Sequence, residues 1–177
     1  MELTISEAPT APRLLKGDFM ILIAYASKTG NAQQAAQKLA ELLPGASLCD
    51  LTKMTPQLEN YDSVIIGAGV RMNSIHKDAK EFLEKNQATL GTKKLAIFIS
   101  NCFADTTDQV LQTAVSDELR GAAVWMGSVG GRLDMAKLKG LDKIVAMAAS
   151  KAVKDDQRVN VELDEVALDK LAACFYQ

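Results

Sequence analysis

The chain has 177 residues, a length that predicts one domain with a single substantial core. Charged residues make up 24% and hydrophobic residues 48%, as in ordinary globular proteins, and the net charge of −2 gives no basic face for nucleic acid or acidic lipid. No apolar run reaches the roughly 18 residues of a transmembrane segment. Three scattered cysteines without a C-x-x-C pair indicate free thiols in a reducing cytoplasm, and a single histidine excludes a histidine-based metal site.

The first 18 residues differ from the rest of the chain. They contain two prolines and lack a long apolar segment, which argues against a signal peptide. Met20 stands where the first apolar run begins. We therefore expect an N-terminal arm over residues 1–18, which is a flexible tail, an added edge element or a non-native extension. A folded domain follows over residues 19–177.

A strand that turns into a helix organises the first part of this domain. Residues 20–24 form a continuous apolar run, which predicts a strand buried on both faces of a parallel sheet. The following apolar positions fall on one helical face, namely Ala32, Ala35, Ala36, Leu39 and Leu43. Between the two lies Ser27-Lys28-Thr29-Gly30-Asn31. Unpaired N–H groups at such a helix start, together with polar side chains, predict an anion site, most naturally for phosphate.

Three types of phosphate loop compete for this pattern. A dinucleotide-binding loop requires G-x-G-x-x-G, and this loop has one glycine. A Walker loop requires glycines before the Lys-Thr pair, and they are lacking here. The flavodoxin loop, [ST]-x-T-G-N-[ST], cradles the phosphate of FMN, and residues 27–32 resemble it at five positions and depart from it at Ala32. The alternative is that these residues merely cap a helix.

Further strands and helices alternate along the rest of the chain. Strands are predicted over residues 46–51, 64–67, 94–100 and 122–126, and helices over 75–83, 108–119, 141–152 and from an N-cap at Asp164 onward. Such alternation predicts a parallel sheet between helix layers, which binds ligands beyond the carboxyl ends of its strands. Those ends are the loops 26–31, 67–75, 100–107 and 127–132.

At this point the chain resembles the flavodoxin superfamily over residues 20 to about 176. The resemblance implies a flavodoxin-like three-layer α/β sandwich, with a five-stranded parallel sheet in the order 2-1-3-4-5 and FMN as cofactor. The tract Gly67-Ala68-Gly69-Val70-Arg71, followed by Ile75-His76, resembles the branch that contains menaquinone-dependent protoporphyrinogen oxidase. A response-regulator receiver domain is excluded, because it needs acidic residues after strand one and an aspartate ending strand three. This chain has Ala26-Ser27 and Gly67 at those places.

The predicted cofactor-binding residues fall in three loops. The phosphate is expected on Ser27, Lys28, Thr29, Gly30 and Asn31, and no metal ligands are expected. The flavin ring is expected between two further loops, which contribute Ala68, Gly69, Val70, Arg71 and Met72 from one side and Asn101, Cys102 and Phe103 from the other.

Individual residues in these loops have competing interpretations. Arg71, near the N1/O2 edge of a flavin, would stabilise the reduced anion and raise its potential, or it is a solvated loop arginine. His76 is expected at a helix opening, exposed or in the first turn. Cys102 is expected to be a small buried thiol, whereas Phe103 covers a flavin face or anchors its loop. Trp125 is expected to pack inside a central strand.

Three functions remain open on the sequence. The favoured one is a cytoplasmic FMN-dependent oxidoreductase that passes electrons between FMN and a small acceptor, with quinones and porphyrinogens as candidates. The second is an electron carrier that serves partner proteins. The third is a binding module without flavin.

Overall fold

The computed structural model describes residues 20–131, 140 and 162–176. The expected N-terminal arm over residues 1–18 and the expected helix over 141–152 lie outside the described residues. The end of the fourth rim loop, at Arg132, also lies outside them.

Five parallel strands form the sheet at the centre of the domain. They are β1 (Ile21–Ala26), β2 (Ser47–Asp50), β3 (Ser63–Arg71), β5 (Lys94–Ser100) and β6 (Ala123–Ser128). Their order is β2-β1-β3-β5-β6, and a short strand β4 (Ser74–Ile75) pairs antiparallel with the end of β3. This arrangement confirms the predicted order 2-1-3-4-5, counted over the parallel strands.

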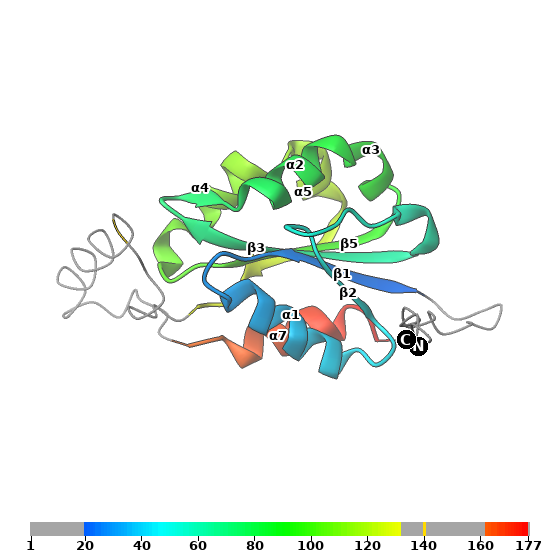
Figure 1. Ribbon diagram of the computed structural model, residues 1–177, viewed down its shortest axis with the longest axis horizontal. Coiled ribbons are helices and arrows are strands. Elements are labelled where there is room, and N and C mark those ends of the chain that lie inside the picture. Colours follow the sequence, from blue (N-terminus) through cyan, green and yellow to red (C-terminus); the bar gives the residue numbers. More distant parts are fainter. Residues whose placement is uncertain (1–19, 132–139, 141–161, 177) are drawn as a thin grey trace, which may run out of the picture.

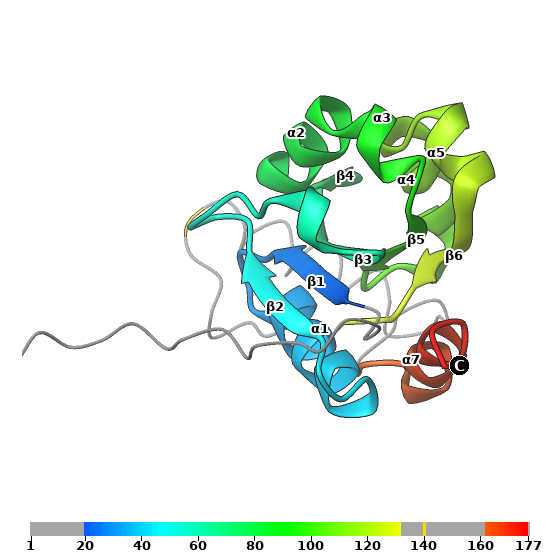
Figure 2. The same ribbon diagram turned by 90° about the vertical axis from the view of Figure 1, so that its right-hand side faces the viewer.

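Helices cover both faces of the sheet, which makes the three layers visible in Figure 1. One layer contains α2 (Lys77–Lys85), α3 (Gln87–Leu90), α4 (Thr107–Ala114) and α5 (Asp117–Ala122). The other contains α1 (Asn31–Leu42) and α7 (Glu165–Ala173), and the view along the strands separates the two layers clearly (Figure 2). Short 3-10 turns lie at Leu58–Asn60 and Ala104–Thr106.

Each face of the sheet carries its own hydrophobic cluster, because neighbouring strand residues alternate between the faces. Leu22, Val64 and Ile97 belong to the cluster under α2–α5, whereas Ile65 and Phe98 belong to the one under α1 and α7. Gly67 lies beside Phe98 in the register of β3 and β5, and a Cβ at Gly67 would stand 2.1 Å from Phe98 Cζ. The absence of a side chain at Gly67 is therefore what lets this buried ring lie across β3.

Three local predictions were wrong. The helix expected over 108–119 is two helices, since Val115 is extended and Ser116 starts α5 by accepting a hydrogen bond from the Leu119 N–H at 3.4 Å. Trp125 lies on β6, which is an edge strand of the described sheet and not a central one. The loop expected over 67–75 is a continuation of β3 to Arg71, followed by a hairpin turn into β4.

Candidate functional site

The carboxyl ends of the five parallel strands bring five connections to one edge of the sheet. These are the loop between β1 and α1, the turn after β2, the β3–β4 hairpin, the loop between β5 and α4, and the segment that follows β6. In folds of this kind, ligands bind at this carboxyl edge, where the strand order reverses. The reversal lies here between β1 and β3, which are adjacent in space although β2 separates them in the chain.

The β1–α1 loop, residues 27–31, ends in a helix start without a capping side chain. Gly30 is the N-cap with φ 92°, a left-handed conformation that favours glycine. Its N–H donates to Ser27 Oγ at 3.0 Å, and the first helical bond runs from the Gln34 N–H to the Gly30 carbonyl at 2.9 Å. No side chain caps this helix start, and the first turn of α1 contains no acidic residue.

The other long helices of the described chain begin differently. His76 caps α2 and Asp164 caps α7, the latter by accepting from the Ala167 N–H at 3.0 Å. All of α2, α4 and α7 have an acidic residue in the first turn, which for α4 is Asp108. Among described helices of eight or more residues, α1 alone has neither a capping side chain nor a first-turn acid. A helix start without these groups suits an external anion, as the sequence predicts for this loop.

The β3–β4 hairpin borders the β1–α1 loop. A Cβ at Gly69 would lie 3.7 Å from the Ala26 carbonyl oxygen and 3.9 Å from Ser27 Cα, so the two segments are in contact. The hairpin turns at Met72 and Asn73, both with positive φ (50° and 57°), and Met72 is 73% exposed.

The side chains of the predicted ring-binding segment, residues 68–72, divide between the faces of β3. Ala68 is buried in the cluster under α2–α5, and Val70 packs against that cluster. Gly69 and Arg71 share the opposite face by strand alternation, which is the face that α1 covers. Arg71 itself is exposed at the end of β3. The segment therefore offers a ligand its backbone, the Arg71 guanidinium and the Met72 side chain.

The β5–α4 loop, residues 101–106, satisfies its own polar groups. Asn101 is 3% exposed, and its Nδ2 donates to the Phe103 carbonyl at 2.7 Å and to Thr106 Oγ1 at 2.9 Å. Its Oδ1 accepts from the Phe103 N–H at 3.1 Å. The predicted contact of Asn101 with the cofactor stays a prediction, and its side chain is hydrogen-bonded within its own loop.

Gly131 marks a convergence that the sequence predictions did not include among the site residues. A Cβ at this buried glycine would stand 2.7 Å from Ser100 Oγ, 3.4 Å from Asn31 Nδ2 and 3.7 Å from Cys102 Sγ. The ends of β5 and β6 and the start of α1 thus meet at one point. The Gly130-Gly131 pair after β6 is the sequence signal that could have indicated this convergence.

Burial raises the pKa of the Cys102 thiol, which keeps it protonated at neutral pH.

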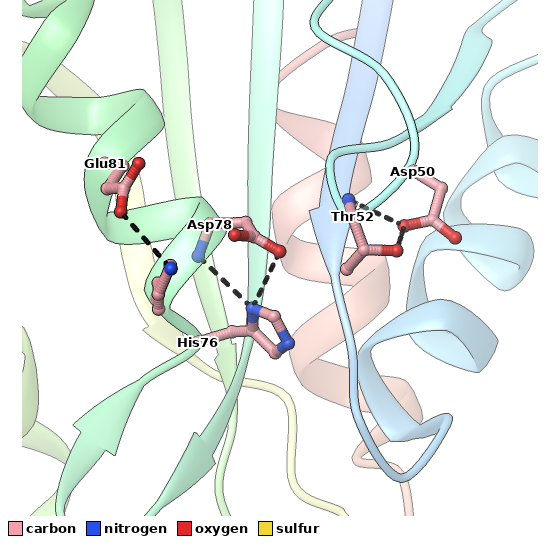
Figure 3. A network of polar contacts seen from close by, with 6 residues as sticks. Asp50, Thr52, His76, Asp78 and Glu81 are labelled. Carbon is pink, nitrogen blue, oxygen red and sulfur yellow. Dashed lines mark hydrogen bonds and ion pairs between the residues drawn. The ribbon is translucent and has the colours of Figure 1, made fainter.

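His76 serves as the N-cap of α2, as expected for a residue at a helix opening. Its Nδ1 accepts from the Asp78 N–H at 3.3 Å and lies 3.6 Å from Asp78 Oδ2, as Figure 3 shows. The backbone N–H of His76 donates to the Gly69 carbonyl at 2.9 Å, and this bond connects the start of α2 to the hairpin. The side chain is 22% exposed and so is neither fully buried nor freely solvated.

Asp50 closes the turn after β2, at the same edge of the sheet. Its Oδ1 accepts from the Thr52 N–H at 3.0 Å and from Thr52 Oγ1 at 2.6 Å (Figure 3), and Lys53 Nζ lies 3.2 Å from Oδ2. Burial acts to raise the pKa of Asp50, but the hydrogen bonds from Thr52 and the Lys53 charge outweigh it, and the pKa is lowered.

Two other kinds of site were sought in the described part of the chain. No group of three or more His, Cys, Asp or Glu side chains there is arranged to hold a metal ion. None of the described helices has the length and apolar character needed to cross a membrane.

Comparison with known proteins identifies the family. A family model described as a flavodoxin domain matches residues 22–160. A curated relative, protoporphyrinogen IX dehydrogenase [quinone] of Escherichia coli K12, is 32% identical over 88 residues, which are 47% of this chain and 49% of the relative. The match thus spans about half the length of this relative. The same protein from Escherichia coli O157:H7 matches equally.

Solved structures agree on the fold. A short-chain flavodoxin associated with a non-canonical PDU bacterial microcompartment superposes with a TM-score of 0.54 at 15% identity, covering 89% of this chain and 96% of that one. A flavodoxin from the domain Archaea gives 0.52 at 10% identity, covering 89% and 100%. Identities this low show the fold alone. The family model, which spans most of the chain, shows that this protein belongs to the flavodoxin domain family.

Proposed function

We propose that this protein is an FMN-dependent oxidoreductase that passes electrons between its flavin and a small acceptor. The observation that carries the proposal is the start of α1, which lacks both a capping side chain and a first-turn acid. In a flavodoxin domain, such a helix start suits the single phosphate of FMN.

The β1–α1 loop supplies the phosphate-binding groups in this proposal. The first turn of a helix has backbone N–H groups without intrahelical acceptors, and these would bind the phosphate. Ser27 Oγ, which accepts from the Gly30 N–H, would donate its hydroxyl hydrogen to it. Lys28, Thr29 and Asn31 add a cation, a hydroxyl and an amide. These groups fit a phosphate dianion without any acidic side chain in the first turn of the helix.

The flavin ring belongs, in the same proposal, between the β3–β4 hairpin and the β5–α4 loop. Gly69 of the hairpin lies beside Ser27, and Phe103 stands on the other loop. Bound FMN supplies one- and two-electron chemistry. The exposed Arg71, at the end of β3, places a cation beside the ring and favours its reduced, anionic form.

The identity of the acceptor rests on the curated relatives. Their name specifies a quinone and a porphyrinogen, and they are 32% identical to this chain over 88 aligned residues. A quinone is therefore the acceptor that we propose for the first assay. The second candidate function is an electron carrier, and the 73% exposure of Met72 at the hairpin tip favours it, because exposed apolar side chains suit docking of a protein.

One experiment tests cofactor and function in sequence. The apoprotein is titrated with FMN, with FAD and with NADH while flavin or nicotinamide fluorescence is followed. We expect saturable binding of FMN at one equivalent and markedly weaker binding of the other two. The reduced holoprotein is then mixed with a water-soluble quinone. We expect the protein to reduce the quinone, and to be reoxidised itself, much faster than free reduced FMN is.

Each possible failure has a distinct meaning. Absence of FMN binding would overturn the proposed cofactor. Binding without accelerated quinone reduction, but with rapid electron transfer to a cytochrome used as a protein acceptor, would establish the carrier function instead.

A further inference from the structure

The β5–α4 loop contains a buried side-chain amide, that of Asn101, which is hydrogen-bonded within the loop. Asn101 is 3% exposed, and both hydrogens of its Nδ2 are used within the loop, on the Phe103 carbonyl and on Thr106 Oγ1. Thr106 Oγ1 also donates to the Phe103 carbonyl at 3.1 Å. The Thr106 N–H donates to the same carbonyl at 3.3 Å, so four hydrogen bonds converge on the backbone of Phe103, counting the one from its N–H to Asn101 Oδ1.

Phe103 is the residue that this network holds. Its side chain is half-buried, but it is not among the side chains that pack against either cluster of described core residues. An aromatic ring outside the core is usually mobile, and a loop loses entropy when it is ordered. A buried hydrogen-bond network that holds the backbone of such a residue indicates that the position of this backbone matters for something other than core packing.

We infer that Asn101 is a positioning residue, which fixes the backbone of Phe103 so that its ring stands ready to cover the bound flavin. The inference rests on the proposed function, because it needs FMN at the carboxyl edge. Asn101 acts through Phe103 and does not itself bind the cofactor. Because the loop is held by its own hydrogen bonds, little further ordering should be required when the flavin binds.

Two variants weaken the network by different amounts. Asn101→Asp keeps the shape and the Oδ1 acceptor but loses the Nδ2 donors, so a carboxylate then faces the Phe103 carbonyl. Thr106→Val removes one hydroxyl and leaves the Asn101 contacts to Phe103 in place. Asn86→Asp is the matched control, since Asn86 Nδ2 donates to the Phe82 carbonyl at 2.9 Å at the end of α2, outside the rim loops.

The measurements separate positioning from simple stability. In the apoprotein, we expect the amide of Phe103 to exchange its hydrogen faster in Asn101→Asp than in the parent. In FMN titrations, Asn101→Asp should raise Kd about tenfold, which corresponds to about 1.4 kcal/mol. The bound flavin should also fluoresce more strongly, because a less well-placed ring quenches it less. Thr106→Val should shift both quantities in the same direction by less.

Three outcomes would overturn the inference. Parent-like Kd and fluorescence in Asn101→Asp, with a lowered melting temperature alone, would reduce Asn101 to a structural residue. An equal loss of FMN affinity in Asn86→Asp would assign the effect to general destabilisation. If the parent bound no FMN, the proposed function would fail first, and the role of Asn101 in flavin binding would fall with it.

Discussion

Two loops at the same edge of the sheet treat their polar groups in opposite ways. The β1–α1 loop leaves the N–H groups at the start of a twelve-residue helix without a capping side chain. The β5–α4 loop folds Asn101 onto its own backbone and uses both hydrogens of the amide there. Both loops follow a buried parallel strand, so the strands do not explain the difference.

The difference indicates a division of tasks at the site. A buried or half-buried polar group left without a partner is destabilising, so an open helix start persists where a ligand completes it. A loop that satisfies itself gains rigidity and can present one side chain in a fixed place. We therefore assign anion binding to the β1–α1 loop and support of the ring to the β5–α4 loop.

The largest expected effect comes from adding a negative charge to the open loop. Thr29→Glu would place a carboxylate beside the bound phosphate, and like charges in a desolvated site cost several kcal/mol, on the order of a thousandfold in affinity. Thr113→Glu, on the exposed end of α4, makes the same change in net charge. Fluorescence titration with FMN should show a strong loss for Thr29→Glu and none for Thr113→Glu. Equal affinity in both variants would place the phosphate elsewhere.

Substitutions at two glycines of β3 test the core and the rim separately. Gly67→Ala would drive a Cβ to 2.1 Å from Phe98 Cζ, in the fully buried part of the core. We expect a loss of about 1–3 kcal/mol or more in the free energy of unfolding, measured by urea denaturation. Gly69→Ala meets only ordinary contacts and should change stability by less than about 0.5 kcal/mol.

A matched double variant and a binding assay test these assignments further. Combining Gly67→Ala with Phe98→Leu should recover part of the loss, because the smaller side chain vacates the contact. Gly69→Ala should instead weaken FMN binding, because the added methyl group would stand beside Ser27, where we propose that the ligand binds. Parent-like stability of Gly67→Ala would contradict the packing explanation for that glycine.

A smaller effect is expected from the cation on the hairpin. Arg71→Ala should lower the potential of the bound flavin, because the reduced anion loses a favourable charge. Arg71 is exposed and solvent screens it, so we expect a shift on the order of 20–40 mV. Dithionite titration against reference dyes measures it, with Lys85→Ala at the far end of α2 as the charge control. An unchanged potential in Arg71→Ala would remove the support that Arg71 gives to the enzyme over the carrier.

The smallest expected effect concerns the turn after β2. The pKa of Asp50 is lowered in the folded protein, so its ionised form adds stability above the unfolded pKa of about 3.9. That contribution is lost as the pH falls through the folded value. Asp50→Asn should therefore be less stable than the parent near pH 7 by about 0.3 kcal/mol, and the gap should close in acid. A gap that widened in acid would reverse the assigned direction of the shift.

The sequence predicted the sheet well because its central strands are continuous apolar runs. Continuous apolar runs such as residues 64–66 and 95–99 are buried on both faces, and their carboxyl ends identified the rim loops directly. The turn at Gly30 was likewise predicted, since one glycine stands between a strand and an apolar helical stripe.

The missed features depend on contacts between distant residues or on weaker local signals. The break between α4 and α5 had a local signal, Ser116 followed by two acids, which a continuous apolar stripe concealed. The hairpin at Met72-Asn73 lacks glycine, so its positive φ values were not predicted. The inward fold of Asn101 depends on Phe103 and Thr106 adopting one loop shape, which periodicity does not encode.

The central claim is that the start of α1 binds the phosphate of FMN, and a comparison of FMN with riboflavin tests it most directly. The two ligands share the same ring and ribityl chain and differ in the phosphate. We predict that the parent binds FMN at least about a hundredfold more tightly than riboflavin, corresponding to roughly 2.7 kcal/mol, with the ratio falling toward one in Thr29→Glu. Equal affinity of the parent for both ligands would contradict the claim.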